Sequence, residues 1–209
     1  MTYVKICGIT SVKDAILAVE AGADALGLNL VPTSKRVIDV ATAAHISDAV
    51  CGNVELVLVV ANRSLSELEE LRAATGIAWL QLHGAEAPAE LALLLPTAYK
   101  AVAVGSDADV ARASEYGGDR LLVDAKVVAE LGGTGQRFDW SLATALSKHR
   151  QLIVAGGLTP ENVGDALREL RPFGVDVASG VEMPGNRRAK DPARMRAFIA
   201  AVRGIDSGP

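Results

Sequence analysis

Eight short apolar runs recur along this chain, and a stretch with helical periodicity separates each run from the next. The runs span residues 3–7, 24–30, 54–60, 78–82, 98–104, 120–125, 151–155 and 174–179. Several are almost continuous in Val, Leu and Ala, which is typical of strands that are buried on both faces. Because strands that alternate with helices form parallel sheets, the pattern predicts either a closed (β/α)8 barrel or an open doubly wound sheet.

Three observations favour the barrel. The runs number eight, and the glycine-rich and polar segments come directly after runs, where barrels build their sites. The first run is not followed by the G-x-G-x-x-G motif of dinucleotide-binding open sheets. We therefore expect a single (β/α)8 TIM barrel over residues 1–203, with residues 204–209 as a disordered C-terminal tail.

Helix-start signals precede several of the periodic stretches. These signals are Ser11 with Asp14, Ser64 with Glu67, Thr159 with Pro160, and Asp191 with Pro192. The first two pairs have capping-box spacing, and the last two place proline at the first helical position. For the first helix we expect an end at Gly22 and an apolar face made of Val12, Ala15, Ile16 and Val19.

Composition and charge exclude several classes of protein. The net charge of -4 over 209 residues is not the basic footprint of a nucleic-acid-binding protein. No apolar run approaches the roughly 18 residues that a membrane span needs, and the N-terminus lacks a signal-peptide pattern, so we expect a cytoplasmic protein with no membrane partner. Cys7 and Cys51 are the only cysteines, too few for a disulfide framework.

Polar side chains at the ends of the predicted strands define the candidate site, because the carboxyl ends of barrel strands surround one mouth. These residues are Cys7, Asn29, Arg36, Asn62, Gln81, His83 and Asp124. The chain contains no H-x-x-x-H, C-x-x-C or carboxylate cluster typical of a metal site, and no nucleotide-binding or serine-nucleophile motif. We predict that the site holds no metal and no cofactor.

Three glycine-rich segments follow the last three predicted strands, at residues 132–136, 155–158 and 178–182. Such glycines either form tight turns or let backbone N–H groups approach an anion. The loops after strands 7 and 8 of barrels commonly bind phosphate, so three such segments in succession favour a phosphate site. The candidate residues are Gly133, Thr134, Gly135, Gly156, Gly157, Ser179 and Gly180.

The residue types alone leave two interpretations for each remaining candidate. Cys7 is either a small buried residue or a thiol whose ionised form is favoured by nearby helix-terminal N–H groups. Asp124 either caps the next segment or acts as a general acid whose pKa is raised by partial burial. Arg36 is either solvated or grips a carboxylate. For His83, we favour a polar residue at the end of a strand, whose hydrogen bonds are satisfied by its neighbours, over a catalytic role.

Several segments together resemble the phosphoribosylanthranilate isomerase family, whose members are (β/α)8 enzymes of tryptophan biosynthesis. They run in order along almost the whole chain, and their combination is highly specific. The segments are VKICGIT (4–10), EAGADALGLN (20–29), QLHG (81–84), LLVDAK (121–126), GGTGQRFDW (132–140), VAGGLTPENV (154–163), VDVASGVE (175–182) and KDPARMRAFI (190–199).

The resemblance implies a phosphosugar substrate and a role for each residue. The family converts N-(5-phosphoribosyl)anthranilate to a 1-deoxyribulose phosphate by an Amadori rearrangement, with a cysteine base at the position of Cys7 and an aspartic acid at the position of Asp124. The family's arginine matches Arg36, which we place with His83 on the anthranilate side, and its phosphate loops match the glycine-rich segments. We expect a monomer or a homodimer.

This chain departs from the family pattern around the anthranilate. The second loop of the family usually reads F-Y-P-x-S-P-R, whereas residues 30–36 read L-V-P-T-S-K-R. The usual phenylalanine of the third strand is also missing from residues 57–62. The resemblance therefore implies an arginine at this end of the site but not the aromatic contacts to the anthranilate ring.

Three other functions agree less well with the sequence. A related isomerase of histidine biosynthesis would carry aspartates at the ends of strands 1 and 5, where this chain has Cys7 and AVAVG. A non-catalytic phosphate-binding relative would be expected to have lost Cys7 or Asp124. A thiol-redox pair of Cys7 and Cys51 is disfavoured, because strand ends and helix ends lie on opposite faces of a barrel.

Overall fold

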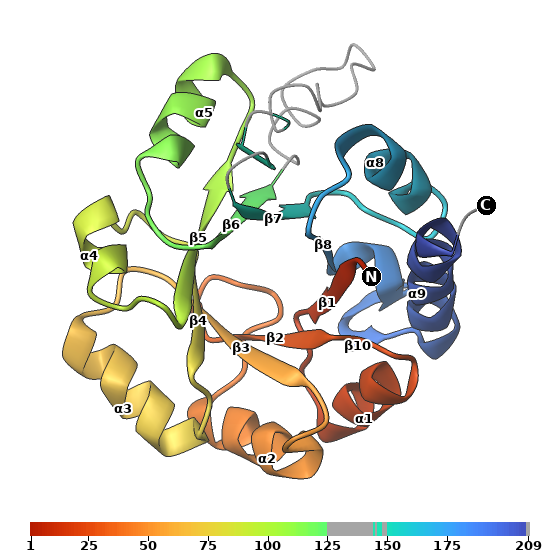
Figure 1. The fold of residues 1–209 in the computed structure, drawn as a ribbon. Helices are drawn as coiled ribbons and strands as arrows, with labels where there is room; N and C mark the ends of the chain where they lie inside the picture. The colour runs from red at the N-terminus through yellow and green to blue at the C-terminus, as the bar shows by residue number, and fades with distance from the viewer. Residues whose placement is uncertain (125–143, 145, 148–149, 208–209) are drawn as a thin grey trace.

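Eight parallel strands close into a barrel in the computed structural model, which describes residues 1–124, 144, 146–147 and 150–207 (Figure 1). The strands pair in chain order, and β1 also pairs with β8. Their bounds are β1 Tyr3–Cys7, β2 Ala25–Asn29, β3 Glu55–Val60, β4 Trp79–Leu82, β5 Ala98–Ala103, β6 Arg120–Asp124, β7 Gln151–Ala155 and β8 Gly174–Val177. All eight lie within the predicted runs, and the barrel rather than the open sheet is confirmed.

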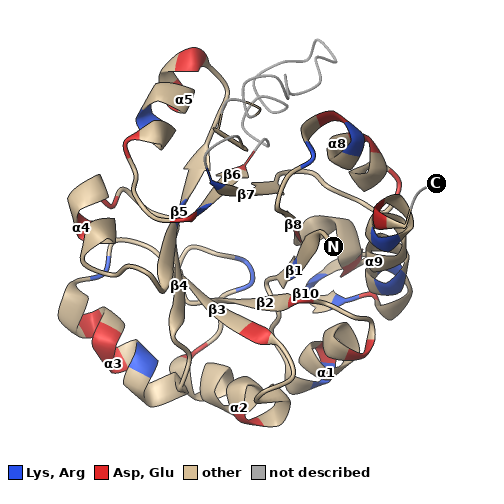
Figure 2. Cartoon of the chain, in the orientation of Figure 1, with Lys and Arg blue, Asp and Glu red and all other residues tan. Residues whose placement is uncertain are grey.

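Helices surround the barrel, and charged side chains are spread over these helices and over the strands and loops (Figures 1 and 2). The helices are α1 Val12–Glu20, α2 Val40–Val50, α3 Leu65–Thr75, α4 Pro88–Ala92, α5 Asp107–Ser114, α8 Val163–Leu170 and α9 Pro192–Asp206. After β8, a short 3-10 helix η1 (Ser179–Val181) leads into a hairpin of β9 (Glu182–Met183) and β10 (Asn186–Lys190), which the sequence analysis did not predict. Over the part of the chain that is described, every helix is too short or too polar to cross a bilayer.

Two-residue alternation along the strands divides the core into two layers. In β1, Val4 and Ile6 belong to the large cluster between strands and helices, whereas Lys5 and Cys7 face the barrel interior and its mouth. A smaller cluster fills the interior and contains Val57, Tyr99, Ala101, Leu122, Ile153 and Ala155. Because side chains alternate between faces, the last inward residue of each strand borders the mouth.

A cation stacked among aromatic rings closes the opposite end of the barrel. Arg120, the first residue of β6, lies 4.0 Å above the ring of Trp79 and 5.3 Å above that of Tyr3. Its guanidinium also pairs with Glu55 at 2.7 Å. These groups stand at the amino ends of their strands, so the amino end is filled and the carboxyl end is left for a site.

Three of the four predicted helix starts are confirmed. Ser11 and Ser64 accept hydrogen bonds from the third residue of their helices, and Asp191 caps α9 ahead of Pro192. The start predicted at Thr159 and Pro160 was wrong, because α8 begins only at Val163. The side chain of Asn162 instead accepts a hydrogen bond from the Thr159 N–H at 2.8 Å and holds a turn before the helix.

Two further expectations need correction. Ile16 was placed on the apolar face of α1 but is 40% exposed, whereas Asp14 is buried and accepts a hydrogen bond from the Lys190 N–H at 3.2 Å. The disordered tail was predicted to begin at residue 204, yet α9 continues to Asp206. The carboxylate of Asp206 accepts hydrogen bonds from the N–H and hydroxyl of Thr2, which tie this end of the helix to the N-terminus.

Candidate active site

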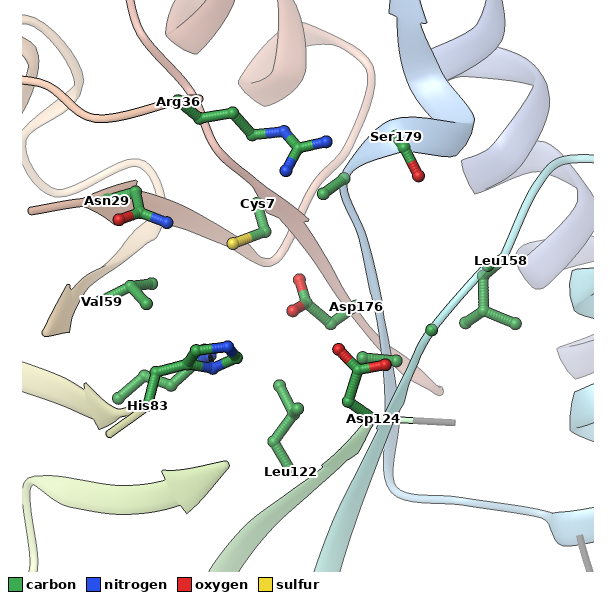
Figure 3. Close-up of a pocket in the computed structure, with 15 residues that line it drawn as sticks. Cys7, Asn29, Arg36, Val59, His83, Leu122, Asp124, Leu158, Asp176 and Ser179 are labelled. Atoms are coloured by element: carbon green, nitrogen blue, oxygen red, sulfur yellow. Dashed lines mark hydrogen bonds between the residues drawn. The ribbon is translucent and has the colours of Figure 1, made fainter. Parts of the chain in front are cut away.

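A pocket opens at the carboxyl ends of the strands and brings together most of the predicted site residues (Figure 3). Those that line it are Cys7, Asn29, Arg36, Gln81, His83, Asp124, Gly156, Gly157 and Ser179. Asn62 instead anchors a neighbouring loop, where its side chain accepts a hydrogen bond from the Ala85 N–H at 2.7 Å. Gly133, Thr134 and Gly135 lie outside the described residues.

Cys7 and Asp124 reach this pocket from well-separated strands. Cys7 ends β1 and Asp124 ends β6, and the closed strand order places β7 and β8 between them. Both side chains are only partly exposed and project into the same space (Figure 3). A molecule bound in the pocket can therefore meet a thiol on one side and a carboxyl group on another.

The electrostatic surroundings of Cys7 differ from the expectation. The N–H groups of Gly8 and Ile9 both donate to the Gly27 carbonyl, so these amides are not available to the sulfur. Burial raises the pKa of the Cys7 thiol and the Asp176 carboxylate raises it further, whereas Lys5 and Lys190 lower it. The cations that favour ionisation of the thiol are thus lysine side chains, not a helix terminus.

A buried polar network lies beneath the thiol. Lys5 has 0% exposure, and its ammonium donates to Gln81 Oε1 at 3.0 Å and pairs with Asp176 Oδ1 at 3.2 Å. Burial alone lowers the pKa of Lys5, but Asp176, Cys7 and Tyr99 outweigh it, so the pKa lies above its ordinary value and the ammonium stays charged. The network therefore places a permanent positive charge in the centre of the barrel.

The same network fixes the orientation of His83. Gln81 Oε1 accepts hydrogen bonds from Lys5 and from the Tyr99 hydroxyl, so Nε2 of Gln81 faces His83 Nδ1 at 3.4 Å. An amide nitrogen can only donate, so Nδ1 accepts and the proton sits on the other ring nitrogen of His83. Burial lowers the pKa of His83, which keeps the imidazole neutral near pH 7.

Arg36 is held over the pocket by the unpredicted hairpin. Its Nε donates to the carboxylate of Glu182 on β9, and Lys190 on β10 lies 3.5 Å from the same carboxylate. Arg188 of β10 also donates to the Val37 carbonyl at 2.9 Å, which fastens the loop that carries Arg36. Because Glu182 engages Nε, the terminal nitrogens of the guanidinium are directed toward the pocket (Figure 3).

The glycines after β7 have the backbone conformation expected of an anion site. Gly156 and Gly157 have φ angles of 98° and 64°, a left-handed region that glycine enters without strain. Consecutive residues of this kind can turn their N–H groups toward one anion. Gly180 is not among the described residues that line the pocket, and a Cβ added there would overlap the Leu158 carbonyl oxygen, so the position has no room for a side chain.

Sequence reasoning missed four charged residues around the pocket, which are Lys5, Asp176, Glu182 and Lys190. Two-residue alternation would have found Lys5, which lies two positions before Cys7 and thus on the same face of β1. The same rule applied to β8 places Asp176 inside the barrel. Within the described residues, no group of three His, Cys, Asp or Glu side chains is arranged to hold a metal.

Gly27 provides a test of this packing. A methyl group at this position would lie 2.7 Å from Cys7 Sγ and 2.9 Å from Lys5 Nζ, although the backbone of β2 would accept alanine. We expect Gly27→Ala to displace the thiol and, with Cys7 as the predicted catalytic base, to lower kcat/KM at least about tenfold, since small misplacements of reacting groups are costly. Steady-state kinetics should show no such loss for Gly204→Ala, where a methyl group in α9 would meet nothing within 4 Å.

Comparison with known proteins agrees with this geometry. Residues 4–201 match the family described as N-(5'-phosphoribosyl)anthranilate (PRA) isomerase. The enzyme of that name from Pseudomonas fluorescens SBW25 is 45% identical over 202 residues, which cover 95% of this chain and 94% of the relative. The crystal structure of phosphoribosyl anthranilate isomerase from Thermotoga maritima has a TM-score of 0.88 at 38% identity, and covers 98% of this chain and 100% of that chain.

A further solved structure contains a ligand. It is a phosphoribosyl anthranilate isomerase in complex with reduced 1-(o-carboxyphenylamino)-1-deoxyribulose 5-phosphate, and it has a TM-score of 0.85 at 35% identity over 98% of this chain and 100% of that chain. These matches extend over nearly the full length of both partners and include the strands that carry Cys7 and Asp124. The chain belongs to the phosphoribosylanthranilate isomerase family.

Proposed function

We propose that Cys7 is the general base and Asp124 the general acid of this isomerase. The observation that carries the proposal is their convergence on one pocket, between Arg36 and the glycines that follow β7. An aldose-to-ketose rearrangement needs a proton donor at the sugar ring oxygen and a proton acceptor at C2′ of the same sugar. The half-buried carboxyl group and the thiol supply these two functions from β6 and β1.

The reaction begins at the ring oxygen of N-(5-phosphoribosyl)anthranilate. Asp124 donates a proton to this oxygen as the bond from the oxygen to C1′ breaks, and the anthranilate nitrogen forms an iminium with C1′. The iminium acidifies the proton on C2′, which the Cys7 thiolate removes. The electron pair of the C2′–H bond forms the C1′–C2′ double bond, and the resulting enolamine tautomerises to the ketone by losing the hydroxyl proton and gaining one at C1′.

The two ends of the pocket suit the two ends of this substrate. We place the carboxylate of the anthranilate on the guanidinium of Arg36, which binds carboxylates bidentately, with His83 beside the ring. The phosphate would lie at Gly156 and Gly157, where positive φ angles present backbone N–H groups, and at Ser179 of η1. The compound bound to the solved relative has the same three parts, an anthranilate-type ring, a ribulose chain and a phosphate.

Aliphatic side chains replace the family's aromatic contacts to the ring. Val59 and Leu122 line the pocket on the same side as His83 (Figure 3). Burial of an apolar ring against such side chains contributes roughly 25 cal/mol per Å² of area removed from water. We propose that this contact, with Arg36, holds the anthranilate part. Glycines 133 and 135 with Thr134 remain phosphate-binding candidates, as does Gly180.

The proposed reaction also bears on the cofactors, location and partners of the enzyme. The proposed chemistry requires only proton transfers, so it needs neither a metal nor a redox cofactor. We propose a cytoplasmic enzyme whose only required partner is its phosphosugar substrate. We propose that the enzyme works as a monomer or as a homodimer.

The direct test is an assay with freshly generated N-(5-phosphoribosyl)anthranilate, followed through the loss of its anthranilate-type fluorescence. We expect rapid loss with the purified protein and none with buffer. An Arg36→Met variant should raise KM more than it lowers kcat, because Arg36 binds the substrate and takes no part in proton transfer. A folded wild-type protein that binds a phosphosugar but does not convert this substrate would contradict the proposed function.

A further inference from the structure

Lys5 is a buried cation that the proposed reaction does not use. Its side chain is 0% exposed and does not border the pocket among the described residues, so it is not placed to touch the substrate. Two of its partners are known, namely Gln81 Oε1 at 3.0 Å and Asp176 Oδ1 at 3.2 Å. Burying an ammonium is costly even when it is paired, so its position directly below the site calls for a physical reason.

Gly27 shows how closely the ammonium approaches the thiol. A methyl group built on Gly27 of β2 would touch Cys7 Sγ at 2.7 Å and Lys5 Nζ at 2.9 Å. The two atoms therefore flank the same small space, which exists only because position 27 lacks a side chain. An ammonium has three N–H donors, of which Gln81 and Asp176 engage two, and the thiol lies beside the same small space.

We propose that the Lys5 ammonium is the shared counter-charge of the Asp176 carboxylate and the Cys7 thiolate, and that it thereby keeps Cys7 able to act as a base. The inference rests on the role proposed for Cys7. Lys5 is a positioning residue in this scheme, since it acts on the substrate only through the thiol. Its electrostatic effect is large because the ammonium is fully buried, where water screens it little.

The physical argument is one of charge balance. When the thiol ionises, the site holds two neighbouring anions, Cys7 and Asp176, which repel each other. Asp176 accordingly raises the pKa of the thiol, and Lys5 opposes this effect. Without the ammonium, either the thiol or the carboxyl group would have to stay protonated, because two like charges in a buried site do not both form readily.

Other charged and titratable groups surround the thiol and must be considered. From the elements packed around it these are Lys190 on β10, Arg36 in the loop after β2, His83 directly after β4, Tyr99 on β5 and Asp124 on β6. Lys190 also favours the thiolate, but it pairs with Glu182 and donates to the Ala178 carbonyl at 2.9 Å. Lys5, in contrast, pairs with Asp176 inside the barrel and lies on β1, the strand that also carries Cys7.

The experiment measures the pKa of the Cys7 thiol directly. All variants carry Cys51→Ala, so that Cys7 is the only cysteine, and the rate of alkylation by iodoacetamide is followed against pH by mass spectrometry. All the compared variants also carry Asp176→Asn, because this substitution removes a carboxyl group whose own charge changes with pH. Adding Lys5→Met to this background should raise the thiol pKa by at least about one unit, a tenfold loss of thiolate at a fixed pH.

Two further variants make the result decisive. Lys5→Gln is a second neutral replacement, for use if the methionine variant does not fold. It should shift the thiol pKa in the same direction. Lys100→Met in the same background should leave the thiol pKa unchanged, because Lys100 is also a buried lysine but pairs with Glu86 at 3.2 Å and donates to backbone carbonyls of Leu82 and Gly84. Near-ultraviolet circular dichroism checks that each variant is folded.

Equal thiol pKa values with and without Lys5 in folded variants would overturn the inference, as would an equal shift for Lys100→Met. Alkylation reports on the thiol whether or not it is the catalytic base. If the Lys5 variants shift the thiol pKa as expected but a Cys7→Ala variant is still active, only the proposed base role of Cys7 is refuted. Failure of this inference and failure of the proposed function are therefore distinguishable.

Discussion

Cys7→Ala should lower kcat by at least about 100-fold, because general base catalysis typically contributes 10²–10⁴-fold and alanine has no proton acceptor. The protein should remain folded, since loss of one sulfur from a partly exposed strand end removes little packing. The measurement is steady-state turnover of phosphoribosylanthranilate by fluorescence. Cys51→Ala is the matched control, because that exposed cysteine caps α2 away from the pocket and its loss should leave turnover unchanged.

The pH dependence of the wild-type enzyme tests the same role. The thiolate is the form that accepts a proton, so kcat/KM should rise with pH until the thiol is fully ionised. Because burial raises the pKa of the Cys7 thiol, this rise should extend above the ordinary thiol value of about 8.5. A Cys7→Ala variant that keeps more than about a tenth of the wild-type kcat would exclude the thiol as the base.

Asp124→Asn should be comparably severe, with a fall in kcat of roughly 10²–10⁴-fold. The amide preserves the shape of the side chain but cannot deliver a proton to the ring oxygen, so ring opening should become the slow step. KM should change much less than kcat, because the role assigned to Asp124 is in the transition state rather than in binding. Fluorescence kinetics on purified enzyme separates the two parameters.

Asp165→Asn is the matched control for this change. Asp165 is an aspartate on the outer face of α8 whose side chain is 63% exposed and pairs with Arg168. Exposed pairs of this kind contribute about 0–1 kcal/mol to stability, so its loss should alter neither fold nor kcat. An Asp124→Asn enzyme with nearly wild-type kcat would show that another group donates the proton, and Asp176 would be the first residue to test.

The barrel itself was predictable because its determinants are local. Each strand is an apolar run bounded by turn residues, and the parallel strands of a closed barrel are buried on both faces, so the signal repeats eight times. Ser64 with Glu67 likewise caps α3 through side chains three residues apart. The start of α8 was misplaced because residues 159–162 form a turn, closed by a hydrogen bond from the Thr159 N–H to the Asn162 side chain, and the helix begins only after it. A cap residue followed by proline suits such a turn as well as a helix start.

The hairpin after β8 escaped prediction for a related reason. Its strands are two and five residues long, and NRRAK of β10 has no apolar alternation. What holds it in place is distant in sequence, since Glu182 binds Arg36, and Arg188 binds the loop that carries Arg36. A segment stabilised mainly by such contacts carries little signal of its own.

The eight-stranded barrel and the residues that end its strands can be predicted from the amino-acid sequence, because strand periodicity and the common direction of parallel strands fix both. The charges around those residues depend on contacts that form only in the folded chain. Lys5 and Asp176 are 171 positions apart and meet because β8 closes on β1. The two-residue alternation predicts which face of a strand a side chain occupies. Which residue it meets across the barrel depends on how the barrel closes and on the strand register, and the ionisation of the Cys7 thiol depends on that neighbour.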